Sequence, residues 1–222
     1  QLRMKYGWKT YWRNPGDSGV PPMFDWSGSQ NLKDAEILYP VPHRFSDANG
    51  TAIGYKNEVV FPIRIVPEDA GKPVLLALTM DYGLCKDMCI PVSVDLKASI
   101  PPDLGTGHGP LIEKAKALVP KPATTGALPR LEAVTFGKEG TEPALEIDAV
   151  FAPHATNTDL FVNSTEVLLP VPSSNGAPTE GKQRFSIVFA TPDEAADVKG
   201  KPLTFTLISD QGASETVHTV PE

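Results

Sequence analysis

Residues 74–100 of this chain read VLLALTMDYGLCKDMCIPVSVDLKASI, two apolar runs joined by a short polar segment. The chain has two cysteines among its 222 residues, Cys85 and Cys89, and both lie in this stretch. Short runs rich in Val, Leu and Ile with period-two alternation are typical of β-strands. The stretch therefore predicts a hairpin of strands Val74–Leu84 and Ile90–Ile100, with the cysteines at its tip.

The register of this hairpin follows if residues 86–88 form a three-residue loop, so that Cys85 faces Cys89. One face then carries the apolar pairs Tyr82 with Val92, Met80 with Val94, Leu78 with Leu96 and Leu76 with Ala98. The other face carries Asp81 with Ser93 and Thr79 with Asp95. Because side chains alternate between faces, both cysteines fall on the polar face, where we expect both sulfurs to be reachable from solvent.

Three interpretations of the cysteine pair stay open from the residues alone. A structural bridge between positions four apart restricts little chain, on the order of 2 kcal/mol in the entropic account. A bond across a tight turn is exposed and easily reduced, which favours a redox couple. Met88 beside two thiolates would suit Cu(I), whereas Met80 is expected in the core. Lys86 favours a thiolate at Cys85 and Asp87 opposes it, so both cysteines are candidate nucleophiles.

Recognised sequence motifs do not point to another catalytic or metal-binding site. The four histidines are dispersed without zinc-site spacing, and each is expected to be an ordinary surface or loop residue: His43, His108, His154 and His218. The sequence contains no G-x-S-x-G, Walker or dinucleotide-binding motif. Hydrolase and nucleotide chemistry are therefore unsupported, and no cofactor is expected.

The composition favours many short strands joined by turns. The chain has 23 prolines, 18 glycines and 41% hydrophobic residues, which predicts an all-β fold with a substantial core. Its net charge of -7 and scattered basic residues argue against a nucleic-acid partner. With no apolar run of membrane-spanning length and no leader pattern at Gln1, we expect a soluble portion of something larger.

The pattern along the chain predicts two β domains separated by a linker. The linker is the Pro- and Thr-rich stretch Pro120–Pro129, and a helix over Gly109–Val119 precedes it. Residues Tyr39–Lys56 are expected to form a long loop. Before the linker, further strands are expected at Leu32–Leu38 and Val59–Val66. After it, strands are expected at Arg130–Gly137, Ala144–Ala149, Thr158–Val162, Gln183–Phe189 and Pro202–Ile208.

Two motifs together resemble a known family. The stretches Trp8–Gly19 and Asp81–Pro91 are similar to the amino-terminal periplasmic region of the DsbD-like protein-disulfide reductases, and most similar to the ScsB branch, the suppressor of copper sensitivity proteins. The resemblance implies that Cys85 and Cys89 form a redox-active pair in an immunoglobulin-like domain. Through mixed disulfides, this pair would take electrons from a transmembrane domain of the same polypeptide and pass them to periplasmic thioredoxin-like proteins. The chain would then be the periplasmic, soluble part of an inner-membrane protein-disulfide reductase.

The chain also departs from the DsbD pattern. Three residues separate Cys85 from Cys89, fewer than in DsbD itself, and the acidic and aromatic cap segment of DsbD has no residue-for-residue match. The stretch from His43 to Tyr55 occupies the corresponding region. Phe45 and Tyr55 within it are the candidate shields of the cysteine pair.

The predicted fold is therefore two immunoglobulin-like β-sandwich domains with one short helix near the linker. The redox domain spans residues 1–122, and a cysteine-free spacer or docking domain spans residues 130–222. Two alternative functions stay open. The cysteines with Met88 would form a Cu(I) site for copper tolerance, or the aromatic opening would make the chain a carbohydrate-binding module. In the second alternative Trp8, Tyr11 and Trp12, beside Asn14 and Asp17, would stack on a sugar.

Overall fold

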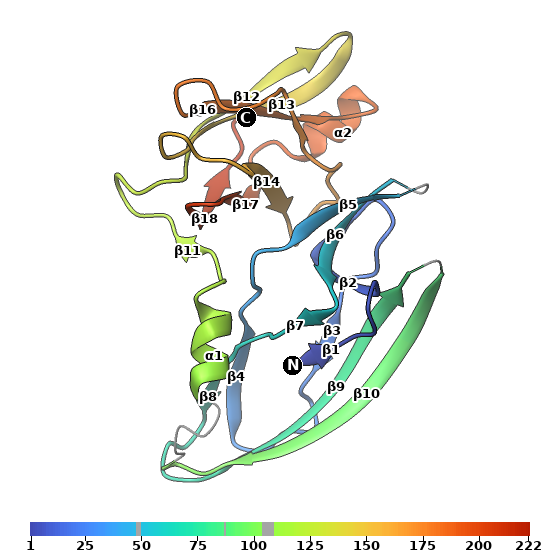
Figure 1. Cartoon of the computed structure of the whole chain (residues 1–222), viewed down its shortest axis with the longest axis vertical. Coiled ribbons are helices and arrows are strands. Elements are labelled where there is room, and N and C mark those ends of the chain that lie inside the picture. Colours follow the sequence, from blue (N-terminus) through green and yellow to red (C-terminus); the bar gives the residue numbers. More distant parts are fainter. Residues whose placement is uncertain (48–49, 87, 104–108) are drawn as a thin grey trace. The chain divides into compact units, whose positions relative to one another are not determined.

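The chain forms two compact units, Gln1–Val119 and Pro120–Glu222. The computed structural model describes residues 1–47, 50–86, 88–103 and 109–222. Strands dominate both units (Figure 1), so the all-β prediction is confirmed. Over the described ranges, no helix combines the length and apolar character that a membrane crossing requires.

The first unit is built on a six-stranded sheet in which neighbouring strands follow the order β10, β9, β2, β6, β5, with β3 also paired to β9. The strands of this sheet are β2 (Lys9–Gly16), β3 (Met23–Asp25), β5 (His43–Asp47), β6 (Gly50–Lys56), β9 (Val74–Cys85) and β10 (Cys89–Ile100). Two smaller sheets pair β1 (Leu2–Arg3) with β7 (Glu58–Val59) and β4 (Leu32–Ile37) with β8 (Ile63–Pro67). The long hairpin of β9 and β10 stands out in Figure 1.

The hairpin has the register predicted from its sequence. Cys85 pairs with Cys89, and the pairing continues without a shift to Val74 opposite Ile100. The predicted apolar face is buried at Leu78, Met80 and Tyr82, against which Val92 and Val94 of the partner strand pack. Period-two alternation therefore decides which face of this hairpin enters the core.

The prediction of a long loop over Tyr39–Lys56 is wrong, because most of this segment forms the hairpin of β5 and β6. Asp47 pairs with Gly50, whose positive φ of 119° is a conformation that glycine adopts without a Cβ clash. The dipeptide Asn49-Gly50 is itself a hairpin signal in the sequence. The expected strand Val59–Val66 is divided into β7 and β8, and the dividing residues include Pro62, which has no amide to donate to a ladder.

The second unit is a sandwich of two four-stranded sheets. One has the order β11, β18, β17, β14 and the other β12, β13, β16, β15. The strands are β11 (Lys121–Pro122), β12 (Arg130–Glu139), β13 (Glu142–Val150), β14 (Asp159–Asn163), β15 (Ser173–Ser174), β16 (Lys182–Val188), β17 (Pro202–Ser209) and β18 (Gly212–Thr219). Both sheets contribute fully buried side chains to one cluster, including Ile147, Leu160, Phe185 and Phe205. This cluster is the core of the unit.

Four elements of the second half were not expected, and one of them is the two-residue strand β15 (Ser173–Ser174). Strand β18 was not expected, and the first residues of the linker form β11, which pairs in parallel with β18 at Ser214 and Glu215. The helix expected over Gly109–Val119 is confirmed as α1 (Gly109–Lys116). A second helix, α2 (Pro192–Asp197), is too short for helical periodicity to reveal. Its local signal is the N-cap Thr191, whose hydroxyl accepts a hydrogen bond from the Glu194 amide.

Candidate functional site: the Cys85–Cys89 disulfide and Tyr11

The two cysteines are joined by a disulfide at the tip of the β9–β10 hairpin. Cys85 is the last residue of β9 and Cys89 the first of β10, and their Cα atoms lie 4.1 Å apart. Their burial is unequal, since Cys85 is 1% exposed whereas Cys89 is exposed. The expectation that both sulfurs are reachable from solvent is therefore wrong for Cys85.

Neighbouring strands explain why Cys85 is buried. The cysteines do lie on the face opposite Met80 and Tyr82, as the register predicts. Cys85, however, packs in a cluster with Tyr11 of β2 and Ala52 of β6, and Phe45 of β5 packs against that cluster. Side chains of three further strands thus cover the Cys85 end of the polar face, and the register of an isolated hairpin does not contain them.

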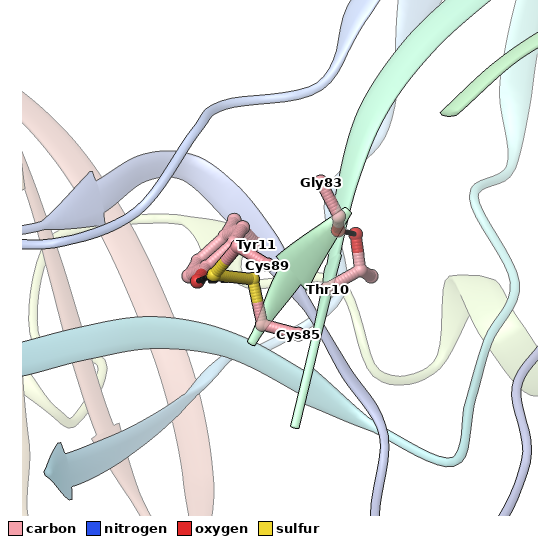
Figure 2. Close-up of a disulfide and its surroundings, with 5 residues drawn as sticks. All are labelled: Thr10, Tyr11, Gly83, Cys85 and Cys89. Carbon is pink, nitrogen blue, oxygen red and sulfur yellow. Dashed lines mark hydrogen bonds between the residues drawn. A yellow bond between two sulfur atoms is a disulfide. The ribbon is translucent and has the colours of Figure 1, made fainter. Parts of the chain in front are cut away.

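Tyr11 is the side chain in direct polar contact with the disulfide. Its hydroxyl donates a hydrogen bond to Cys85 Sγ at 2.8 Å and lies 3.3 Å from Cys89 Sγ. The residue is 2% exposed, so this contact is shielded from bulk water. Figure 2 shows the Tyr11 ring beside the two sulfurs, with the hydroxyl directed at them.

A glycine and a threonine position Tyr11. A Cβ atom at Gly83 would lie 3.1 Å from Cε2 of the Tyr11 ring, so the absence of a side chain lets the ring lie close along β9. The preceding residue of β2, Thr10, donates from its hydroxyl to the Gly83 carbonyl at 2.9 Å. These contacts, drawn in Figure 2, hold β2 against β9. Lys9 of β2 pairs with Cys85 at the same place.

Tyr11 is a candidate for a different role when the sequence is taken alone. In the sugar-binding alternative Trp8, Tyr11 and Trp12 would stack on a sugar, but Trp12 is 1% exposed, Tyr11 is 2% exposed and Trp8 is half-buried. Rings so deeply buried offer no face to a carbohydrate, which contradicts the sugar-binding alternative. The hairpin register alone carries no signal for Tyr11, because it is 74 residues from Cys85 in the chain.

The two candidate shields lie on opposite faces of the β5–β6 hairpin. Phe45 pairs with Ala52 and packs on the cluster that contains Cys85. Tyr55 is three residues beyond Ala52 and so points to the other face of β6, where its ring packs edge-on against Phe61. The Tyr55 hydroxyl donates to the Pro40 carbonyl at 2.8 Å, and burial raises the pKa of this phenol well above 10.0. Of the two residues, Phe45 is the one beside the disulfide.

For the Cu(I) alternative, one of the two candidate thioether ligands is accessible. Met88 is 69% exposed in the hairpin loop, whereas Met80 is 7% exposed on the opposite face of the sheet. Within the described ranges, no three His, Cys, Asp or Glu side chains gather into a metal-binding group. Asp87 and His108 lie outside the described residues.

Comparison with known proteins shows one family match and one similar solved structure. Residues 1–101 match the family described as "Thiol:disulfide interchange protein DsbD, N-terminal". The structure is similar to that of the N-terminal periplasmic domain of ScsB from Proteus mirabilis, with a TM-score of 0.74 and 23% sequence identity, covering 99% of this chain and 85% of that one. No curated protein sequence gives a significant match. The structural likeness establishes the fold across both units, and the two matches confirm the resemblance inferred from the sequence.

Proposed function

We propose, on the premise that residues 1–101 match the N-terminal family of thiol-disulfide interchange proteins, that this chain is an electron-relay module of a protein-disulfide reductase. The observation that carries the proposal is the unequal environment of the two sulfurs. Cys89 is exposed to an incoming thiolate, whereas Cys85 is buried beneath Tyr11 and Phe45. A purely structural bridge has no need of such an arrangement.

The unequal exposure of the two sulfurs supports attack at Cys89. A donor thiolate attacks Cys89 Sγ, the bond between Cys85 and Cys89 breaks, and a mixed disulfide forms between the donor and Cys89. The electron pair of the broken bond leaves on Cys85 Sγ, which becomes a thiolate. The Tyr11 hydroxyl, 2.8 Å away, stabilises this leaving group, because hydrogen bonds to an ionised acceptor are stronger than those to a neutral one.

A second exchange completes the reduction. The second thiolate of the donor attacks its own sulfur in the mixed disulfide and releases Cys89 as a thiolate. The donor is then a disulfide, and both cysteines of this chain are reduced, so two electrons have been transferred. Cys89 can next attack the disulfide of an acceptor, and Cys85 resolves that mixed disulfide to regenerate the bond seen here.

The direction of transfer and the partners follow from the family resemblance. The donor would be a transmembrane domain of the same polypeptide, and the acceptors would be periplasmic thioredoxin-like proteins. The module would therefore act in the periplasm as part of an inner-membrane protein. In this proposal the second, cysteine-free unit serves as a spacer or docking domain.

The reduction potential of the full chain tests the proposal. Equilibration with glutathione redox buffers, followed by alkylation and mass spectrometry, gives the fraction of reduced pair at each potential. A relay pair is expected to titrate above about -300 mV, within reach of physiological thiols. A potential well below that value would indicate a structural bridge and would contradict the relay.

A further inference from the structure

A row of side chains crosses the sheet at the level of the disulfide. Lys56 of β6 pairs with Lys9 of β2, Lys9 pairs with Cys85 of β9, and Cys85 pairs with Cys89 of β10. Directly paired residues lie on the same face of a sheet, and neighbouring strands are about 4.8 Å apart. Two lysines therefore stand in line with the cysteines, on the face that carries the sulfurs.

Both lysines converge on the aromatic ring that covers Cys85. The ammonium of Lys56 lies 4.8 Å from the centroid of the Phe45 ring, and that of Lys9 lies 5.9 Å from it. These are cation–π distances, at which the face of the ring attracts a cation. Phe45 thus holds positive charge close to the disulfide as well as covering it.

A third lysine stands at the hairpin tip. Lys86 directly follows Cys85 and is exposed, and a Cβ atom at Gly7 would lie 3.6 Å from its Cε. The cysteine end of the unit, defined here as Lys9, Lys56, Lys86 and the two cysteines, is therefore basic. This contrasts with the whole chain, whose net charge is -7.

A carboxylate close to Lys56 in the chain is already engaged. Glu58, two residues after Lys56, accepts a hydrogen bond from the Gln1 amide at 2.6 Å and lies 4.0 Å from Arg3 Nε. Asp87, in the loop beside Lys86, lies outside the described residues. Asp87 adds one negative charge at the cysteine end, where the three lysines add three positive charges.

We propose that the redox partner of this chain carries carboxylates around its reactive cysteine. This inference rests on the proposed relay function and adds the chemistry of the partner surface. Opposite charges around two reacting sulfurs speed their encounter and orient them, and this effect weakens as salt shortens the Debye length. Exposed side chains near the tip suit the centre of such an interface, since Met88 is 69% exposed and Tyr6, next to Gly7, is 90% exposed.

Three synthetic peptide disulfides test the inference with the full reduced chain. Each is a symmetric dimer of one short peptide, whose single cysteine is flanked by Glu, by Lys or by Gln residues. The second-order rate of exchange is measured at about 20 mM and about 500 mM salt, where the Debye length differs severalfold. The Glu peptide is expected to react about tenfold faster than the Lys peptide at low salt and at nearly the same rate at high salt.

Substitutions locate the effect. Lys56→Gln and Lys86→Gln should each reduce the preference for the Glu peptide at least twofold, whereas Lys56→Arg and Lys86→Arg should retain it. Lys138→Gln, an exposed lysine of the second unit, is the matched control and should change nothing. Lys9 is buried, so replacing it would confound charge with folding.

The outcomes separate the two proposals. Equal rates for the Glu and Lys peptides at low salt, or a faster Lys peptide, would overturn the inference while the relay function stands. If the uncharged Gln peptide and both charged peptides all failed to exchange, the relay function itself would be wrong, and the inference would fall with it.

Discussion

The hydroxyl of Tyr11 donates a hydrogen bond to Cys85 Sγ at 2.8 Å, across a sequence separation of 74 residues. The contact joins β2 to the tip of the β9–β10 hairpin and lies in a shielded environment, because both residues are almost fully buried. A donor so placed stabilises negative charge on sulfur more than it stabilises a neutral disulfide. Tyr11 is therefore expected to favour reduction of the pair.

Tyr11→Phe should slow reduction of the disulfide by dithiothreitol about tenfold, because a hydrogen bond to a charged group contributes about 1.5 kcal/mol or more. The ring remains, so the fold should be retained. Tyr82→Phe is the matched control, since Tyr82 is a buried tyrosine on the opposite face of β9. Equal rates in the two variants would show that the Tyr11 hydroxyl has no role in the exchange.

Gly83→Ala should act through Tyr11, because the added Cβ atom would lie 3.1 Å from the ring and displace it. We expect slower reduction in this variant, as in Tyr11→Phe. The double variant should be little slower than Tyr11→Phe alone, because the two substitutions remove one interaction. Fully additive effects on the logarithm of the rate would contradict this positioning role of Gly83.

Phe45→Ala should uncover Cys85. In the reduced protein, alkylation of the Cys85 thiol by iodoacetamide is expected to become at least fivefold faster, as peptide mapping by mass spectrometry would report. Tyr55→Phe is the control, since Tyr55 points away from the disulfide. It should leave alkylation unchanged while costing about 1 kcal/mol of stability, because the Pro40 carbonyl loses its donor. Unchanged alkylation of Cys85 in Phe45→Ala would contradict the shielding role.

Met88→Ala separates the relay from the copper alternative. With dithiothreitol as the donor, which needs no protein interface, the exchange uses only the two sulfurs and Tyr11, so its rate should remain within twofold of the wild type. If the reduced pair also binds Cu(I) through Met88, titration with Cu(I) in the presence of a competing chelator should show weaker binding in Met88→Ala and none in Cys85→Ser. A large loss of exchange in Met88→Ala would count against the proposed mechanism.

The second unit should lose some stability in acid. Arg184 donates to both oxygens of Asp148, at 2.7 and 2.8 Å, and these hydrogen bonds lower the pKa of Asp148 from 3.8. A carboxyl with a lowered pKa stabilises the folded state above its unfolded pKa, and this contribution is lost as the pH falls through its folded pKa. Because the pair is partly exposed, the contribution should be about 1 kcal/mol or less. Thermal unfolding of Arg184→Gln should show a smaller decrease in stability below pH about 4 than the wild type.

The sequence contains enough information to predict the hairpin and its register. Alternating apolar residues on both sides of a three-residue loop leave one pairing that buries Met80 and Tyr82, and the structure has that pairing throughout. The same stretch also indicates the candidate site, since Cys85 and Cys89 are the two cysteines of the chain. Local periodicity was sufficient for these features because the contacts are local.

The environment of the sulfurs depends on contacts that local patterns do not encode. Cys85 is buried by Tyr11, Phe45 and Ala52, which come from strands distant in the sequence. Phe45 lies beside Cys85 because the segment Tyr39–Lys56, which was expected to be a loop, contains the β5–β6 hairpin. The inequality between Cys85 and Cys89 could therefore not be read from the register of one hairpin.

The most direct test of the relay is to trap the mixed disulfide on each cysteine in turn. Cys85→Ser and Cys89→Ser are incubated with the disulfide form of a small peptide, and the mixed disulfide is quantified over time by mass spectrometry. The account predicts that Cys85→Ser, which keeps the exposed Cys89, forms the mixed disulfide at least tenfold faster than Cys89→Ser, which keeps the buried Cys85. Equal rates, or faster trapping on Cys85, would contradict the account.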